Sequence, residues 1–399
     1  MLQPAIPQSA VRNPQLAALL TLALLHALVD AFALFVQPLW PDLQRSFGRR
    51  PEDVQWAYVS WSLATSFSQL AFGYLGDRYH SRWLLWFGPA LGMVCVCSIG
   101  LIDNFLVLNG VLLLGGLGIA AFHPEAAAAA GSCLPANRSR AMSVFAVGGY
   151  LGQAAGPLYS GIVTTQYGLR GLSWSLLWGT ALLALLMAAL RRSAVVSPAP
   201  SVSAAPRADV RGLLQGRGGV VALLLVTCTL RVLPMLGVPL AVAFAIKLAG
   251  GTNAQIGQVQ SAFLVGIGVG SLACAWLVRP DNERLAMWLL PLIAAPLLAA
   301  CPGLHGGWLL AAVAASGTIL GGAMPVLIGY GQQLLPEAQR VASSLTMGVT
   351  WGLGGLIVAV AMAYTNQRGA PQEAIYFFAG CAAVSSLLSV YLPAPRATA

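Results

Sequence analysis

The sequence predicts an all-α integral membrane protein whose twelve transmembrane helices form two pseudo-symmetric halves of six helices each. Of its 399 residues, 58% are hydrophobic and only 8% are charged, with a mean hydropathy of +0.76. A soluble domain carries about 25% charged residues, so this chain has too few charges to cover itself with a polar surface. The apolar residues also form stretches long enough for spans of roughly 20 residues, and a pattern in the first half recurs in the second.

We locate the expected membrane helices by the length of each apolar stretch and by the charged segments that separate one stretch from the next. In chain order, the expected membrane helices cover residues 15–40, 54–75, 83–102, 105–132, 141–165, 172–190, 219–246, 255–278, 285–302, 307–334, 341–365 and 372–392. A break rich in Pro, Ser and Ala separates the sixth helix from the seventh and is expected to be a disordered linker. The predicted organisation is a tail (1–14), an N-terminal half (15–190), a linker (191–218), a C-terminal half (219–392) and a second tail (393–399).

The positive charges indicate topology. The formal net charge is +9, but the arginines lie in short clusters between apolar spans, a placement that argues against nucleic-acid binding. With the N-terminus inside, fourteen arginines fall on cytoplasmic segments, whereas five arginines and Lys247 fall outside. Both termini are therefore expected in the cytoplasm.

The first tail lacks a basic start and a short apolar core, so no removable signal peptide is expected. The seven cysteines are expected to be small core residues.

The two halves repeat a glycine pattern. Gly148 and Gly152 recur as Gly348 and Gly352, with an offset of 200 residues. The fifth span therefore corresponds to the eleventh, as in a parallel repeat of six spans. Glycines four residues apart share one helix face and allow close helix packing. In the fifth span, Gly156 and Pro157 follow, and the proline permits a bend because it removes a backbone hydrogen bond.

Four ionisable residues at membrane depth are the main candidates for function: His26 and Asp30 in the first span, and His123 and Glu125 in the fourth. Such groups are costly in hydrocarbon and often form proton relays. We expect Asp30 and Glu125 to exchange protons and the histidines to tune them. His123 and Glu125 lie about 200° apart on an ideal helix, so only one faces the cavity, and we expect that one to be Glu125. The alternatives are a buried polar network or, less favoured, a metal site.

Arg231, in the middle of the seventh span, needs a negative partner. It is expected to be a counter-ion of Asp30 or Glu125 across a central cavity, or to bind an anionic substrate; contact with lipid is the remaining alternative. Further polar and aromatic residues are weaker candidates for lining the cavity. They are Asn109, Tyr150, Gln153, Tyr330, Gln332, Gln333 and Trp351.

The loop between the second and third spans contains Gly73, Asp77, Arg78 and Arg82. It resembles the G-x-L-x-D-R-x-G-R-K loop of the major facilitator superfamily. Small residues allow a tight turn, and opposed charges can hold neighbouring helix ends in one conformation. The alternative is a simple positive-inside loop. The equivalent loop of the second half, 278–284, lacks the pattern.

The chain resembles one group within that superfamily, the fosmidomycin-resistance transporters. The resemblance is carried by His26-x3-Asp30, by Phe122-His123-Pro124-Glu125, by Val147-Gly148-Gly149-x-x-Gly152, by Gly156-Pro157-Leu158 and by Tyr330-x-Gln332-x-Leu334-Leu335-Pro336. The glycine–proline pair also resembles a motif of drug/proton antiporters. What the resemblance implies is the major facilitator fold and a proton-driven exporter in the inner membrane of a bacterium.

These observations predict a secondary active transporter that works by alternating access, with proton-coupled efflux of a drug or an anionic metabolite as the leading hypothesis. Uptake or facilitated exchange on the same fold is the alternative, and a membrane-embedded enzyme is a more distant one. The expected partners are a small-molecule substrate, protons and the lipid bilayer, with no nucleic acid, cofactor or metal. A monomer is expected.

Overall fold

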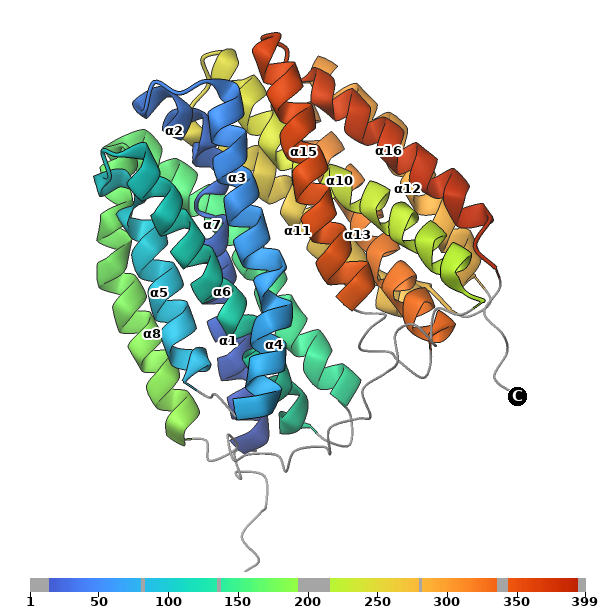
Figure 1. Ribbon diagram of the computed structural model, residues 1–399, viewed down its shortest axis with the longest axis horizontal. Coiled ribbons are helices and arrows are strands. Elements are labelled where there is room, and N and C mark those ends of the chain that lie inside the picture. Colours follow the sequence, from blue (N-terminus) through green and yellow to red (C-terminus); the bar gives the residue numbers. More distant parts are fainter. Residues whose placement is uncertain are drawn as a thin grey trace, which may run out of the picture.

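The computed structural model describes residues 14–79, 83–134, 138–192, 216–279, 282–335 and 344–393. The described residues form helices and turns and contain no strand. Residues 14–192 form one helical bundle and residues 216–393 a second one beside it (Figure 1). Most of the predicted tails and of the predicted linker lies outside the described residues.

The first bundle begins with a long helix that continues into a short one. Its helices are α1 (Pro14–Leu34), α2 (Trp40–Ser46), α3 (Pro51–Ser66), α4 (Ser68–Tyr79), α5 (Leu84–Ser98), α6 (Phe105–Cys133), α7 (Arg138–Tyr167) and α8 (Ser175–Arg192). Local sequence explains several of the boundaries. The Asn104 side chain accepts hydrogen bonds from the first turn of α6, and Gly168, at φ +66°, adopts the left-handed conformation directly after α7.

The second bundle contains α10 (Gly218–Leu248), α11 (Asn253–Leu277), α12 (Glu283–Ala300), α13 (Gly306–Leu334), α15 (Thr350–Gln367) and α16 (Glu373–Val390). A π-helical segment, Ser344–Val349, precedes α15 and contains Gly348. The turn between α10 and α11 is defined by Gly250 at φ +81° and by a capping box in which Thr252 and Gln255 exchange hydrogen bonds.

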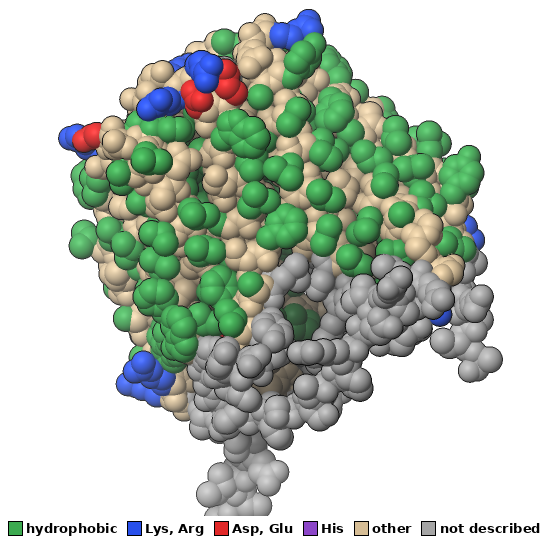
Figure 2. Space-filling model, in the orientation of Figure 1, with side chains coloured by type: hydrophobic (Ala, Val, Ile, Leu, Met, Phe, Trp, Pro, Cys, Tyr) green, Lys and Arg blue, Asp and Glu red, His purple; other side chains and the backbone are tan. Residues whose placement is uncertain are grey.

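Nine helical segments among the described residues are long and apolar enough to cross a membrane. The other three predicted spans, 54–75, 141–165 and 341–365, are also helical where the structure describes them, but they do not meet both conditions. Hydrophobic side chains cover the middle of the molecule, and charged side chains gather toward its ends (Figure 2). The fold class predicted from the sequence, an all-α multi-pass membrane protein, is confirmed.

The glycines of α7 allow it to lie directly against α1. A Cβ atom at Gly148 would collide with the carbonyl of Ala23, and one at Gly152 would collide with the carbonyl of Ala27. The helix continues through Pro157. The predicted close packing therefore has α1 as its partner in this half.

The two bundles contact each other at the end of the molecule that carries α2 and the α10–α11 turn, which we call the closed end. There α7 packs against α11 and α3 against α15. A Cβ atom at Gly257 would collide with the carbonyl of Pro157, and one at Gly352 with the ring of Phe67. Toward the opposite end, where α8 ends and α10 begins, the bundles diverge (Figure 1); we call this the open end.

Candidate functional site

A cluster of polar side chains lies inside the first bundle, where α1, α6 and α7 meet. Helix α1 contributes His26 and Asp30, which share a face because they are one helical turn apart. Helix α6 contributes His123, and α7 contributes Gln153. The approach of α7 depends on Gly149, since a Cβ atom there would lie only 3.1 Å from Oδ2 of Asp30.

Asp30 is the centre of this cluster. Its Oδ1 lies 2.9 Å from Nε2 of His123, its Oδ2 accepts a 2.9 Å hydrogen bond from Nε2 of Gln153, and Nε2 of His26 lies 3.5 Å from Oδ2. The side chain of Asp30 is 5% exposed and that of His26 11%, whereas that of His123 is 21% exposed. Of these three side chains, that of His123 is the most exposed.

Backbone carbonyls fix the tautomers of both histidines. Nδ1 of His26 lies 2.9 Å from the carbonyl oxygen of Phe145, and Nδ1 of His123 lies 2.8 Å from that of Ile119. A carbonyl oxygen only accepts, so both Nδ1 atoms carry hydrogen and each neutral ring has a lone pair at Nε2. With Nδ1 of His123 as donor to its backbone carbonyl, the 2.9 Å contact with Asp30 is a hydrogen bond when a further proton is present, on the imidazole or on the carboxyl group.

The same three side chains bring together donor atoms that suit a metal. One ligand atom from each of His26, Asp30 and His123 lies within 4.8 Å of the others. The His123–Asp30 pair is in direct hydrogen-bonding contact, and Gln153 donates to the carboxylate. These contacts also suit a network that binds a proton.

The structure places His123, rather than Glu125, against the pair on α1, and the expectation that Glu125 faces the central cavity stays a prediction. Glu125 is half-buried on α6 and does not belong to the group of ligand atoms around Asp30. The two residues point in different directions on the helix, and the rotation of α6 in the bundle directs His123 toward α1.

The expectation that Arg231 faces Asp30 or Glu125 is wrong. Arg231 is fully buried inside the second bundle, where its Nη2 donates to the carbonyl of Met287 at 2.7 Å and to Oγ of Ser389 at 2.8 Å. The carbonyl of Met287 is available because Pro291, one turn later on α12, has no N–H to donate to it. Arg231 thus binds a carbonyl group of its own half. That carbonyl has no hydrogen-bond partner within its helix, because the residue one turn later is a proline.

Of the seven weaker candidates for the cavity, Gln153 joins the cluster. Tyr150 packs against Gly268 of the opposite half. Tyr330 donates to the carbonyl of Pro393, and Gln333 lies 3.5 Å from the carboxylate of Glu283. For the others, Asn109 donates to a carbonyl of its own helix, and Gln332 and Trp351 are half-buried.

The predicted conformational loop is only partly described. Gly73 lies on α4, where a Cβ atom would be 3.7 Å from that of Pro124 on α6. Asp77 and Arg78 are in the last turn of α4, but their side chains, together with all of Arg82, lie outside the described part of the chain. Its role as a latch stays a prediction.

The structure shows a second polar cluster, at the closed end, that the sequence analysis did not identify. Nζ of Lys247 lies 2.6 Å from Oδ1 of Asp42, and Nδ2 of Asn253 donates to Oδ2 of the same carboxylate at 2.6 Å. Asn253 also accepts from Lys247 and donates to Thr164. Asp42 and Thr164 belong to the first bundle, and Lys247 and Asn253 to the second. The signal available in the sequence was that Lys247 is its only lysine.

A more exposed link joins the two halves beside this cluster. Nε2 of Gln367 donates to the carboxylate of Glu52 at 3.2 Å. Glu52 lies outside the predicted span 54–75, and hydrogen bonds from its own backbone and from Gln367 lower its pKa. The link is therefore charged at neutral pH and weakens only when the pH falls through that lowered pKa.

Comparisons with known proteins agree with this architecture. A family model described as Major Facilitator Superfamily matches residues 20–359. The fosmidomycin resistance protein of Escherichia coli (strain K12) is 25% identical over 378 residues, which cover 94% of this chain and 92% of that protein. An uncharacterized MFS-type transporter of Bacillus subtilis (strain 168) is 23% identical over 344 residues, covering 85% of this chain and 84% of that protein.

Solved structures show the same fold. The nucleoside transporter NupG superposes with a TM-score of 0.72 at 13% identity, covering 95% of this chain and 99% of that one. The fucose:proton symporter of E. coli superposes with a TM-score of 0.62 at 16% identity, covering 94% and 98%. At these identities, the likeness concerns the fold alone.

Proposed function

Because the chain belongs to the Major Facilitator Superfamily, whose members are transporters rather than enzymes, we propose that it exports a small molecule in exchange for protons. The similarity to a fosmidomycin resistance protein over 94% of the chain supports export of a drug or an anionic metabolite. The bacterial relatives support a location in the inner membrane, and the arginine bias supports cytoplasmic termini. The protein acts as a monomer in this proposal.

The cluster around Asp30 is the observation that carries the proposal. Both Nδ1 atoms have a backbone carbonyl as acceptor, and a proton bound between His123 and Asp30 would complete the hydrogen bonds of the cluster. When that proton leaves, a lone pair faces a carboxylate in a buried site, and the two groups repel each other strongly because little water screens them. Proton release therefore disfavours the observed contact between α6 and α1 and favours a different arrangement of these helices.

Helix α7 offers a route from the proton to the opposite half. Gln153 binds Asp30, and the carbonyl of the next residue, Ala154, accepts a hydrogen bond from Ser261 on α11. A change in the position of α7 at the cluster is therefore transmitted to the contact between the halves, which is the contact that alternating access must break. With cytoplasmic termini, the open end faces the cytoplasm, and the proposal assigns the described conformation to the inward-facing, proton-loaded step of the cycle.

Transport by everted membrane vesicles tests this proposal. Vesicles that contain the full chain are acidified inside by respiration, and uptake of fosmidomycin and of other small anionic or amphipathic drugs is measured. Wild type is expected to accumulate at least one compound, and addition of that compound is expected to release protons from the vesicles. Asp30→Asn removes the titrating carboxyl group and should abolish both effects, whereas Asp103→Asn changes an exposed carboxylate and should leave them intact.

Folding of the two variants is compared by size-exclusion chromatography and by thermal unfolding with the transported compound. Proton-driven transport that persists in a folded Asp30→Asn variant would contradict the proposal. If the proton gradient instead drove the compound out of the vesicles, toward the side that corresponds to the cytoplasm, the proposed direction would be wrong and the protein would be an uptake transporter.

A further inference from the structure

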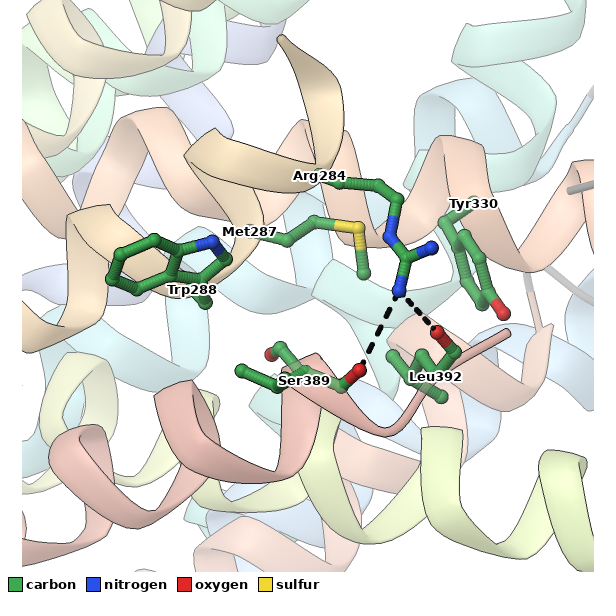
Figure 3. Close-up of a pocket in the computed structure, with 7 residues that line it drawn as sticks. Arg284, Met287, Trp288, Tyr330, Ser389 and Leu392 are labelled. Atoms are coloured by element: carbon green, nitrogen blue, oxygen red, sulfur yellow. Dashed lines mark hydrogen bonds between the residues drawn. The ribbon is translucent and has the colours of Figure 1, made fainter. Parts of the chain in front are cut away.

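A small cavity of about 100 Å³ lies between α12, α13 and α16, at the open end of the second bundle. Arg284, Trp288, Tyr330 and Ser389 are among the residues that line it (Figure 3). All of them belong to one half, so the cavity does not depend on the contact between the halves. The proton cluster described above is in the other half.

The charge of this cavity is positive. The guanidinium of Arg284 lies in it and donates a 2.9 Å hydrogen bond to the carbonyl of Leu392, just after the end of α16. None of the described residues that line the cavity is acidic. Glu283, the carboxylate next in the chain, is not among them and lies near Gln333 instead. An arginine in such a place is suited to bind an anion, because its planar group matches the geometry of a phosphate.

Arg231 lies behind the wall of the same cavity. Both of its described hydrogen-bond acceptors, Met287 and Ser389, line the cavity. Its Nε and Nη1 are buried and have no hydrogen-bond partner within the described part of the chain. A buried cation without a counter-ion is unfavourable, and an anion in the cavity would provide negative charge on the side where Arg231 is already directed.

The surroundings of the cavity favour a lipid as the source of that anion. Val390 lines the cavity and is exposed, and the chain neighbours of two lining residues, Leu285 after Arg284 and Tyr391 after Val390, are exposed as well. Trp288 is half-buried in its wall, and tryptophan and tyrosine are enriched at the level of lipid headgroups. An apolar rim next to a basic pocket between membrane helices matches the two parts of an anionic phospholipid, its acyl chains and its phosphate.

We propose that this cavity binds the phosphate group of an anionic phospholipid. Arg284 contacts the phosphate directly, Tyr330 and Trp288 flank it, and the acyl chains lie over the exposed apolar residues of α12 and α16. Arg231 contributes long-range attraction through its buried charge. The site is independent of the proposed transport activity.

Lipid binding to the purified full-length protein in detergent tests this proposal. Native mass spectrometry and thermal unfolding are followed during titration with cardiolipin, phosphatidylglycerol, phosphatidylcholine or inorganic phosphate. Arg284→Gln removes the exposed guanidinium of the cavity, and Arg279→Gln is the matched control, because Arg279 is exposed at the same end of the bundle and does not line the cavity. Neither variant alters the proton cluster.

The anionic lipids are expected to bind wild type and Arg279→Gln with the same affinity and Arg284→Gln about tenfold more weakly, as the loss of one charge-assisted contact predicts. Phosphatidylcholine should bind weakly to all three proteins. Equal binding of anionic lipids to Arg284→Gln, or equal binding of phosphatidylcholine to wild type, would overturn the proposal. Inorganic phosphate could instead stabilise wild type and not Arg284→Gln, while the lipids have no effect on either protein. That result would overturn the lipid as the ligand and assign the cavity to soluble phosphate.

Discussion

Ser261 of α11 donates a 2.6 Å hydrogen bond to the carbonyl of Ala154 on α7, one residue after the glutamine that binds Asp30. Two consecutive residues of one helix therefore contact the titratable cluster and the opposite half of the molecule. If α7 moves as a rigid helix, a displacement at one of these contacts is expected to reach the other, which would connect the cluster around Asp30 with the contact between the halves.

The two histidines are expected to contribute unequally to coupling. His123 is nearer to Asp30 than His26 is, and its side chain is more exposed. We expect His123→Gln to lower proton-driven transport in everted vesicles by about tenfold or more, the equivalent of one lost charge-assisted hydrogen bond, and His26→Gln to lower it less. Equal losses in both variants would contradict a dominant role for the contact between His123 and Asp30.

Glu125→Gln is expected to lower transport less than Asp30→Asn does. The physical reason is the position of Glu125, which lies on α6 but outside the group of donor atoms around Asp30. Proton release upon addition of the transported compound is the measurement. Complete loss of this signal in Glu125→Gln, with Asp30→Asn still active, would make Glu125 the primary proton carrier in place of Asp30.

The cluster at the closed end is expected to stabilise the described conformation. Lys247→Met removes the cation that contacts Asp42, and the loss should be about 1 kcal/mol, as for a partly exposed ion pair. Hydrogen–deuterium exchange in the α10–α11 turn should then become faster, and high salt should reduce the difference from wild type. A double-mutant cycle with Asp42→Asn provides the control, since the second substitution should add little once the first is present.

The contact between α1 and α7 is expected to tolerate no side chain at Gly148. Gly148→Ala places a methyl group against the carbonyl of Ala23, so α7 must move away. A loss of about 1–3 kcal/mol in stability is typical of such overpacking, and the midpoint of thermal unfolding should fall. Gly110→Ala is the matched control, because a Cβ atom at Gly110 meets nothing within 4 Å; equal stability of the two variants would contradict the packing described here.

The helices could be located from the sequence because membrane insertion depends on local hydrophobicity. Nine of the twelve predicted spans correspond to helices that meet the conditions for a membrane span, and the family resemblance carried by the Phe122–Glu125 segment is confirmed by the match over residues 20–359. The pairing of His26 with Asp30 was also predictable, because a spacing of four residues places both on one face of a helix.

The partners of His123 and Arg231 could not be predicted in the same way. One span carries both His123 and Glu125, and only the rotation of α6 within the bundle decides which of them meets Asp30. Arg231 needed an acceptor, but the sequence did not show that Pro291 leaves the carbonyl of Met287 available at the right position. The contact between Asp42 and Lys247 joins residues about 200 positions apart and depends on how the halves meet.

The sequence by itself determined that the chain is a multi-pass helical membrane protein of this superfamily, and it singled out the ionisable residues at membrane depth, because both properties depend on residue type and on spacing within one helix. Only the tertiary structure decided that Asp30 contacts His123, that Arg231 stays within its own half and that one end of the molecule is closed. These features depend on the rotation and packing of helices that are distant in the sequence, and no pattern within a single helix specifies them.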